Sequence, residues 1–587
     1  MLDNNDLEGP KIDRRTSLKL LSAAGFSGVS AGLAGCTGES EPDETEGDSP
    51  SQGSTDSPTP PESGGGEITA AWLVNQIPRL DPHMVNKGVQ MQIMSNLFNG
   101  LLKINTNREI VGDAASDWTI SDDGTTYEFT IREGITFHNG DTLDAEMCKA
   151  SIDRVREMEE SPHGGKVAMV ESVEAPDSTT LVITLERATA PFLSFMTVVP
   201  GRAGAIVNVD AVEEMGDDEY TRMPVGSGPF ELTERDTGTS LTLEKFDDYW
   251  ETDEEGNQLP YLDQVTIELI PEPSTLWTAV KTGSAQFASK IPGQFADQAR
   301  SASNIQLRQT SPGNWKGLSL LANNPAEDPY NKWAEWVSGE EEFAGADTWG
   351  GKEIPTENPK VRRAIAKAID REALIEKAYF GLGVPAHWLF NPLMFVYEEN
   401  PEPGQYYDPE GAKELLDEAG YTGDPRFEMR ILGTPDDERG LTVIQSQLSE
   451  VGIEAELDIQ QSSSYWTTIY EYDHMASMYG GATAVDPYAD WYKQLHTPVP
   501  PEEGVGGTWQ KGLYSNEEFD EIMEEDFRTA DRDKREELIK EGMEIFVEDA
   551  PYAMTVFPQV GKPQGGGLKN VGIQVGMSNF HRAYVED

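Results

Sequence analysis

The residue types that most often carry chemistry are scarce in this sequence and do not fall at productive spacings. Its seven histidines show no spacing typical of a metal site. No His-Glu-x-x-His zinc motif occurs, and the Gly-x-Ser-x-Gly run at 28–32 lies in the weakly apolar stretch before Cys36. Carboxylates are so abundant that any pair could be proposed by chance. The sequence therefore predicts no catalytic residue, no metal site and no cofactor. The histidines are His83, His138, His163, His387, His474, His496 and His581.

The chain has only two cysteines, which excludes a disulfide framework and a cysteine-rich metal site. Cys148 recurs with Ile152 and Val155 at helical spacing and is predicted to be a core residue. Cys36 ends the run Leu33-Ala34-Gly35-Cys36, which resembles a lipoprotein cleavage box. In such a box the small residues fit a peptidase, and the thiol accepts a lipid. We therefore expect Cys36 to be lipidated.

An export signal precedes this box. Arg14 and Arg15 stand before an uncharged, weakly apolar stretch, 20–35, that is too short to span a bilayer comfortably. The pattern resembles a twin-arginine signal, the route for proteins that fold before export, although Ser17 stands where a larger apolar residue is usual. Residues 1–35 are thus predicted to be a signal peptide. Residues 36–66, rich in Ser, Thr, Pro, Gly and acid, are predicted to be a disordered tether.

Length and charge bound the remaining possibilities. A chain of 587 residues needs two or three domains, and 37% hydrophobic residues suffice for their cores. The net charge of −59, from 104 acidic and 45 basic residues, repels nucleic acid and anionic lipid. The acid is spread along the chain, which favours a halophilic surface that stays hydrated in high salt over an ordinary acidic extracellular protein.

Strands alternate with helices from Glu67 onward. Residues 68–73 are predicted to be a first strand and 89–98 a helix. Alternating apolar residues at 127, 129 and 131 indicate a half-buried strand, and Ile135 and Phe137 a returning strand. Residues 325–358, which are acidic and contain three tryptophans, are predicted to be a loop insertion. The pattern is typical of an α/β protein.

A series of short blocks resembles the family 5 extracellular solute-binding proteins, the dipeptide- and oligopeptide-binding subunits of ABC importers. Each block is weak alone, but together they follow the family's order from residue 68 to the C-terminus. Most of them also have a structural reading, and Arg362, Arg363 and Arg371 are expected to be surface or ion-pair residues. The blocks are Leu80–His83, Asn99–Leu102, 121–140, Val225–Phe230, Asp248–Trp250, Leu259–Val265, Pro359–Ile365, Ala368–Arg371, Tyr407–Leu416, Tyr472–Asp473 and Asp486–Pro487.

The resemblance implies a two-lobed, periplasmic-binding-protein-like clamp that closes on its ligand. Lobe I would comprise residues 67–101, 222–312 and 556–587, and lobe II residues 313–555. Residues 102–221 would form an added subdomain. The partners implied are a small-molecule or peptide ligand and the permease subunits with their cytoplasmic ATPases. The protein itself would sit at the outer face of the cytoplasmic membrane, held by its lipid.

The resemblance also suggests where the ligand binds. Asp486 stands where peptide binders of the family pair an aspartate with the ligand's α-amino group, although an aspartate before proline is equally typical of a turn. Tyr479 or Gly480 stands where a tryptophan is frequent in the family. Trp315 and Trp466 are further candidates for walls of the pocket, with a core role as the alternative.

Three functions remain open at this point. The first is a peptide-binding lipoprotein of an ABC importer, which needs an anion for the ligand's amine. The second is the same machine with an oligosaccharide or metal-chelate cargo. The third is a secreted hydrolase, for which the sequence offers no positive sign.

The charge generates the first prediction. Added salt screens the self-repulsion of a chain with net charge −59, so the thermal midpoint should rise with salt into the molar range. Thermal melts across a salt series measure this. A midpoint that is flat or falls with salt would contradict the halophilic interpretation.

Overall fold

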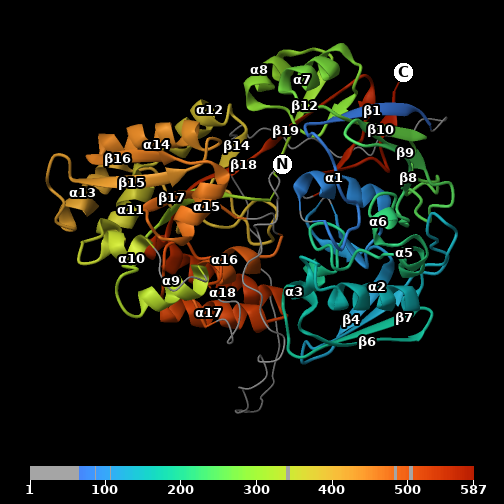
Figure 1. Ribbon diagram of the computed structural model, residues 1–587, viewed down its shortest axis with the longest axis horizontal. Coiled ribbons are helices and arrows are strands. Elements are labelled where there is room, and N and C mark those ends of the chain that lie inside the picture. The colour runs from blue at the N-terminus through green and yellow to red at the C-terminus, as the bar shows by residue number, and fades with distance from the viewer. Residues whose placement is uncertain are drawn as a thin grey trace, which may run out of the picture.

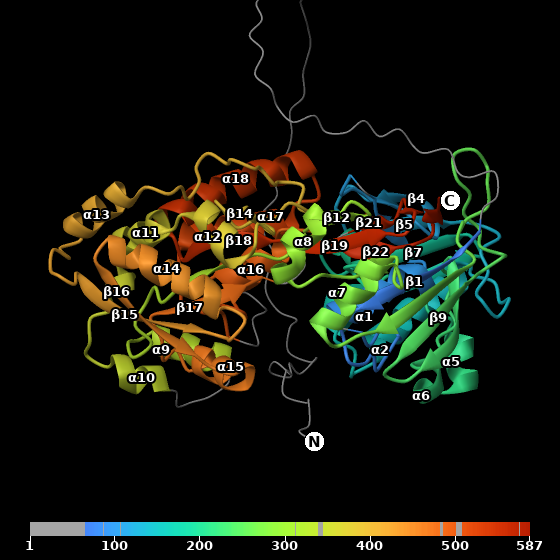
Figure 2. The ribbon, with the colours of Figure 1, turned by 90° about the horizontal axis from the view of Figure 1, so that it is seen from above.

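The computed structural model describes residues 65–85, 87–105, 107–311, 313–338, 344–481, 485–500, 507–574 and 576–586. Arg14, Arg15, Cys36 and the tether up to residue 64 lie outside these ranges. Two large α/β bodies lie side by side, each built on its own sheet (Figures 1 and 2). Within the described ranges, no helix is long and apolar enough to cross a membrane.

The first body, lobe I, is built on a seven-stranded mixed sheet. Its central strand β1 runs parallel to its neighbours β10 and β11 and is buried almost throughout, as central parallel strands are. The predicted first strand is therefore confirmed. In sheet order the strands are β12 (Ile305–Thr310), β19 (Val560–Gly565), β11 (Phe287–Ala288), β1 (Glu67–Trp72), β10 (Gln264–Leu269), β9 (Ser240–Lys245) and β8 (Phe230–Asp236).

The second body, lobe II, is built on a six-stranded sheet. Strand β13 lies between two antiparallel partners, β18 and β17, while β15 and β16 are parallel. In sheet order the strands are β14 (Gly383–Pro385), β18 (Tyr552–Pro558), β13 (Lys316–Leu320), β17 (Ala476–Gly480), β15 (Phe427–Gly433) and β16 (Ile453–Ile459).

Between β1 and β8 the chain forms a separate antiparallel sheet, the added subdomain. The predicted strand at 127–131 is β5, whose alternating burial points one face at helix α2 and its core. Cys148 lies on α2 and is fully buried, as predicted. The strands in order are β4 (Ala115–Ile120), β5 (Thr126–Ile131), β7 (Thr180–Leu185) and β6 (Val170–Asp177), and α2 spans Ala145–Glu157.

Helices cover these sheets and begin where their caps predict. Asp408 accepts a hydrogen bond from the Gly411 amide and Pro409 occupies the first turn of its helix, as the sequence indicates. In lobe I the helices include α1 (Gly88–Leu97), α7 (Pro273–Thr282) and α8 (Ala296–Ser301). In lobe II they include α11 (Pro359–Ala368), α12 (Arg371–Ala378), α13 (Pro409–Glu418), α14 (Glu438–Glu450), α15 (Ser462–Tyr470), α16 (Tyr488–Leu495), α17 (Glu517–Arg528) and α18 (Arg532–Asp549). The subdomain adds β2 (Leu102–Ile104), β3 (Ile110–Gly112), α3 (Gly164–Val167), α4 (Phe192–Phe195), α5 (Val209–Met215) and α6 (Asp217–Tyr220). The C-terminal segment of lobe I adds β20 (Leu568–Lys569), β21 (Gly572–Gln574), β22 (Met577–Asn579) and β23 (Tyr584–Val585).

The chain passes between the lobes twice. It leaves lobe I after β12 and enters lobe II at β13, and it returns between β18 and β19 at Gln559. The two passages run antiparallel, because Thr310 pairs with Val560 on one side and Lys316 with Val556 on the other. Both views place β12 and β19 between the bodies (Figures 1 and 2). We therefore place the return three residues later than position 556.

Three local expectations are wrong. Ile135 and Phe137 are buried but form no strand, since only an isolated bridge joins Thr136 to Thr142. The insertion 325–358 contains two helices, α9 (Tyr330–Ser338) and α10 (Ala344–Trp349). The latter is held by the Trp349 indole, which donates to the Tyr472 carbonyl at 2.9 Å.

The third wrong expectation concerns two arginines, Arg362 and Arg371, that were expected to be surface or ion-pair residues. Arg362 and Arg371 are only 4% and 2% exposed, so neither is a surface residue. Their guanidinium groups donate to backbone carbonyls: Arg362 to Asp549 at 2.6 Å and Arg371 to Ala386 at 2.8 Å. A guanidinium carries five donors, and here the two arginines reach backbone carbonyls at the last residue of α18 and just after β14.

Candidate functional site: the cleft between the lobes

The two lobes touch at the end of the cleft away from the passages. The loop before α4 and α4 itself, in the subdomain, meet α16 and α17 of lobe II. The Ala190 amide donates to the Phe527 carbonyl at 3.0 Å, and the Phe195 ring meets Tyr488 edge-on with 6.4 Å between centroids. In Figure 1 the subdomain lies level with α16 to α18, below the sheets. These contacts form a latch, and any site between the passages and the latch is closed off by both lobes.

The four predicted wall residues gather at the end of β17. The Tyr479 ring lies 5.9 Å from Trp315 and 6.2 Å from Trp466, edge-on to both, and Gly480 is the next residue along the strand. Trp315 is fully buried and Tyr479 is 9% exposed. The structure therefore brings Trp315, Trp466, Tyr479 and Gly480 together. Trp315 is the member that lies in the core.

Close packing accounts for the glycines that follow Tyr479. A Cβ atom built on Gly480 would lie 2.6 Å from the Trp315 carbonyl oxygen. One built on Gly481 would lie 2.1 Å from the Trp315 indole nitrogen and 2.4 Å from Asp490 Oδ1. A side chain at either position would displace Trp315, so the tryptophan frequent in the family cannot be accommodated at Gly480 in this arrangement.

Asp486 contacts a different set of side chains. Its carboxylate forms a two-pronged ion pair with Arg535 of α18, at 2.7 and 3.0 Å, and Oδ1 accepts from the Tyr488 amide at 3.0 Å. Arg535 Nε also donates to Asp526 at 2.7 Å. The hydrogen bond from the Tyr488 amide is the contact expected of an aspartate in a turn before proline. The cluster nevertheless holds two carboxylates against one guanidinium, which leaves one net negative charge when both acids are ionised.

One acidic residue that the sequence analysis missed lies one turn further along the helix. Asp490 is fully buried, and its Oδ1 accepts from Gln494 at 3.2 Å. Burial raises the pKa of Asp490 to about 8, so this side chain is mostly protonated at neutral pH. No motif marks it, because an aspartate at a helical position usually faces solvent. The carboxyl group of Asp490 packs against Gly481, just after the end of β17.

A buried lysine on the other side of Tyr479 was also missed. Lys511 is 1% exposed, and its Nζ lies 4.0 Å above the Tyr470 ring and 5.6 Å from Tyr479. Among the described residues, no hydrogen-bond partner reaches this nitrogen. Burial lowers the pKa of Lys511 to about 7. Cation–π contact therefore replaces ion pairing at this position.

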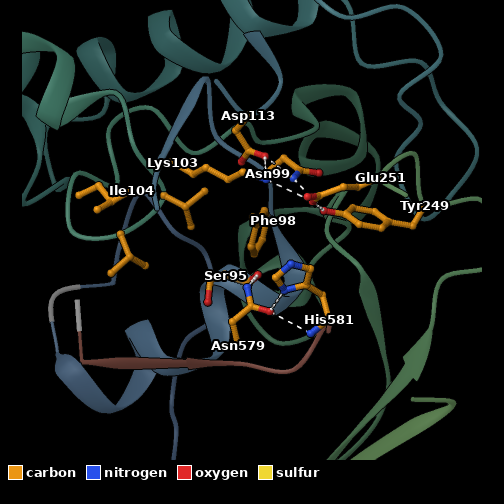
Figure 3. Close-up of a pocket in the computed structure, with 12 residues that line it drawn as sticks. Ser95, Phe98, Asn99, Lys103, Ile104, Asp113, Tyr249, Glu251, Asn579 and His581 are labelled. Atoms are coloured by element: carbon orange, nitrogen blue, oxygen red, sulfur yellow. Dashed lines mark hydrogen bonds and ion pairs between the residues drawn. The ribbon is translucent and has the colours of Figure 1, made fainter. Parts of the chain in front are cut away.

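A separate small cavity of about 40 Å³ lies where the subdomain joins lobe I (Figure 3). Its charges are paired internally: Lys103 lies 3.2 Å from Glu251 and 3.7 Å from Asp113, and Asn99 donates to Asp113 at 2.9 Å. The Tyr249 hydroxyl donates to Glu251 at 3.1 Å. Burial raises the pKa of Asp113 despite the nearby Lys103. The cavity is thus a satisfied polar junction that attaches the subdomain.

Several family motifs serve the same attachment. Asp81 forms an ion pair with Arg154 of α2 at 2.6 Å, and His83 Nε2 lies 3.1 Å from the Ala205 carbonyl. Asn99 Oδ1 accepts from the Trp250 indole at 3.2 Å. The His138 ring lies between the Gly226 amide and the Gly228 carbonyl, at 3.2 and 3.1 Å. These motifs therefore position the subdomain and not the ligand.

Residues 109–499 match the family described as bacterial extracellular solute-binding proteins, family 5. The chain belongs to this family. As a family 5 solute-binding protein it is 27% identical over 483 residues to the glutathione-binding protein GsiB of Salmonella paratyphi A, covering 81% of this chain and 85% of that protein.

Solved structures of binding proteins share the two-lobed fold. The periplasmic binding protein DppA of Helicobacter pylori, in complex with the peptide STSA, matches with a TM-score of 0.66 and 25% identity, over 89% of this chain and 99% of that one. HbpA2 of Haemophilus parasuis matches with a TM-score of 0.73 and 20% identity, over 89% and 100%, which supports the fold alone.

The protonation of Asp490 gives a prediction with a defined sign. Its pKa is about 8 in the folded chain and about 3.9 in an unfolded one, so the stability it confers is complete below pH 4 and is lost as pH rises to 8. Asp490→Asn mimics the neutral acid and removes this loss. The variant should gain about 1–3 kcal/mol in unfolding free energy relative to wild type between pH 5 and 8, since one pKa unit corresponds to about 1.36 kcal/mol.

Denaturant unfolding of both proteins at pH 5 and pH 8 measures this difference. Asp486→Asn is the matched control, because it removes an ionised partner of Arg535 and should destabilise at both pH values. A difference between wild type and Asp490→Asn that does not grow with pH would show that Asp490 is ionised in the folded protein.

Proposed function

We propose that this protein is the substrate-binding lipoprotein of an ABC importer and that it captures peptides by closing its two lobes. The observation that carries the proposal is the two-passage clamp with a latch between subdomain and lobe II, in a chain that belongs to family 5. Closure removes the cargo from water and presents a surface that permease subunits can recognise. The ATPases of such an importer act on the cytoplasmic side.

Peptide cargo is favoured by the relatives and by one charge in the cleft wall. GsiB binds glutathione, itself a small peptide, and the DppA structure holds the peptide STSA. The cluster of Asp486, Asp526 and Arg535 carries one excess negative charge when ionised, and Asp486 is its more exposed acid, with a side chain 14% exposed. We place the ammonium group of the cargo against Asp486, since a buried ammonium requires such a partner.

Other cargoes and other chemistry make different demands. An oligosaccharide would bind through aromatic faces and neutral polar groups, and the cluster of Trp466 and Tyr479 is the feature that suits it. A metal chelate would serve as cargo through its organic ligand. A secreted hydrolase would release product from a peptide library. The family to which the chain belongs is one of solute-binding proteins, and we therefore propose no catalytic residue.

The cargo prediction is tested on ligand that co-purifies with the protein. Mass spectrometry should find short peptides, and calorimetry should show that N-acetylation of such a peptide weakens binding to wild type. Asp486→Asn should lose at least about tenfold in affinity for the free amine, which is about 1.4 kcal/mol. The acetylated peptide should bind variant and wild type alike.

Two results would contradict this assignment. Co-purified sugar or chelate without peptide would favour the alternative cargo, and cleaved peptide would favour the hydrolase. If Asp486→Asn binds the free amine within about threefold of wild type, the amine lies elsewhere.

The route to the membrane is a separate part of the proposal. We infer twin-arginine export and a lipid on Cys36, with the folded body held beyond the tether at the outer face of the membrane in a salty environment. Replacing Arg14 and Arg15 by Lys should leave precursor in the cytoplasm. Cys36→Ala should release the protein from membranes, and fractionation followed by immunoblotting measures both. Unchanged secretion of the first variant, or membrane retention of the second, would contradict the respective step.

A further inference from the structure

A second contact between the lobes lies beside the return passage. In lobe I the Ile291 amide donates to the Gly561 carbonyl at 2.8 Å. In lobe II the Leu382 carbonyl accepts from the Gln559 amide at 3.1 Å. Gln559 and Gly561 are only two residues apart along the chain, so the segments that contain Ile291 and Leu382 are held close to each other. The passage thus brings these two segments of opposite lobes into contact.

The centre of this contact is an aromatic ring of lobe II that lies on a glycine of lobe I. A Cβ atom built on Gly293 would lie 2.3 Å from Cδ2 and 2.9 Å from Cε2 of Phe380. Only a residue without a side chain lets the ring approach the backbone of lobe I so closely. The two segments are therefore in close-packed contact and cannot move nearer unless the ring is displaced.

Two arginines, one from each lobe, hold Phe380 in place. Arg300 of α8 donates through Nη2 to the carbonyls of Phe380 and Gly381, at 3.0 and 3.2 Å, and through Nη1 to Asp297 at 2.7 Å. The guanidinium of Arg439, on α14, lies 4.0 Å from the centre of the Phe380 ring. Phe380 itself is left-handed, with φ +58°, which costs energy for a bulky residue. The surrounding contacts therefore fix a conformation that the residue alone does not favour.

We call Gly293, Arg300 and Phe380 the brace, and its position relative to the passages defines what it can do. The brace lies next to α8 and α12, which Figure 1 shows above the passages, whereas the latch lies below them, near α3 and α16. Two bodies that rotate about the passages move in opposite senses at these two ends. Separation of the latch therefore presses Phe380 against Gly293, which the ring already touches.

We propose that the brace limits the opening of the lobes and thereby sets the balance between the open and closed states of the cargo-free protein. The proposal rests on the lobe closure of the proposed function, and it holds for any cargo. The apparent affinity for cargo falls with the fraction of protein that is competent to close on it. Residues behind the passages, which touch no cargo, therefore tune how tightly cargo is held.

Two substitutions should move the balance in opposite directions. Phe380→Ala removes the ring and gives the lobes room to open, so binding of a co-purifying peptide, measured by calorimetry, should weaken at least about threefold. Gly293→Ala sets a methyl group against the ring, which should force this end apart, favour closure and tighten binding. The backbone of Gly293 is not left-handed, so alanine is not strained there by its own φ.

The decisive measurement needs no cargo. Pulsed electron paramagnetic resonance between spin labels on Glu174→Cys of β6 and Glu418→Cys of α13 should give a longer mean distance in Phe380→Ala and a shorter one in Gly293→Ala than in wild type. The double variant should match Phe380→Ala, because its methyl group no longer meets a ring. Phe427→Ala is the matched control, since the half-buried Phe427 packs on Tyr421 within lobe II, with 5.2 Å between ring centroids. It should lower the thermal midpoint and leave the distance unchanged.

The outcomes separate the brace from the clamp itself. A folded Phe380→Ala with the distance of cargo-free wild type would overturn the brace, as would a shorter distance in this variant. If the co-purifying peptide still shortens the distance in wild type, the clamp of the proposed function stands and the brace alone is wrong. If neither peptide nor any variant changes the distance, the lobes do not move, and the proposed closure fails together with the brace.

Discussion

The organisation of this protein depends on one constraint: the two sheets are joined only by two short antiparallel passages. Thr310 pairs with Val560 at one end of these passages, and Lys316 pairs with Val556 at the other. Each lobe must therefore bury its own apolar core, and it does so around its own sheet. Apart from the passages, the lobes are held against each other by the latch and by contacts such as that of Arg300 on α8, which donates to the Phe380 carbonyl of lobe II at 3.0 Å. Cargo can then shift the balance between open and closed states.

The latch is small and built from few groups. A backbone hydrogen bond from Ala190 to Phe527, a ring contact between Phe195 and Tyr488, and a hydrogen bond from the Arg108 guanidinium to the Pro392 carbonyl join the subdomain to lobe II. A hydrogen bond contributes about 1 kcal/mol net, and an aromatic pair a similar amount. Contacts so few can be outweighed by those that bound cargo makes with both lobes.

The sequence predicted the features that depend on local pattern. The alternation at 127–131, the cap at Asp408 and the helical spacing of Cys148 are short-range signals, and each appears as expected. The family resemblance supplied the two-lobed fold, which no periodicity could have given. The cluster of Trp315, Trp466 and Tyr479 also follows from the resemblance, since its members are distant along the chain.

The remaining features depend on contacts between distant segments. Arg535 reaches Asp486 from 49 residues away, and nothing near Asp486 announces an ion pair. Burial decides the protonation of Asp490 and Lys511, and burial at a single polar position is not readable from composition. Ile135 and Phe137 are apolar as in a strand, yet within the described residues only the isolated bridge between Thr136 and Thr142 forms there. Arg362 and Arg371 are buried and donate to the backbone carbonyls of Asp549 and Ala386, which lie far from them along the chain or beyond their own helix.

The central claim is that cargo closes the two lobes around a cleft. The distance between the subdomain and lobe II, measured with and without cargo, tests it most directly. Spin labels on Glu174→Cys of β6 and Glu418→Cys of α13, both exposed, report this distance by pulsed electron paramagnetic resonance. Cys36 is replaced by Ala, and Cys148 stays unlabelled because burial raises the pKa of its thiol. Cargo should shorten and narrow the distance distribution relative to the cargo-free protein. Identical distributions with and without saturating cargo would contradict the clamp.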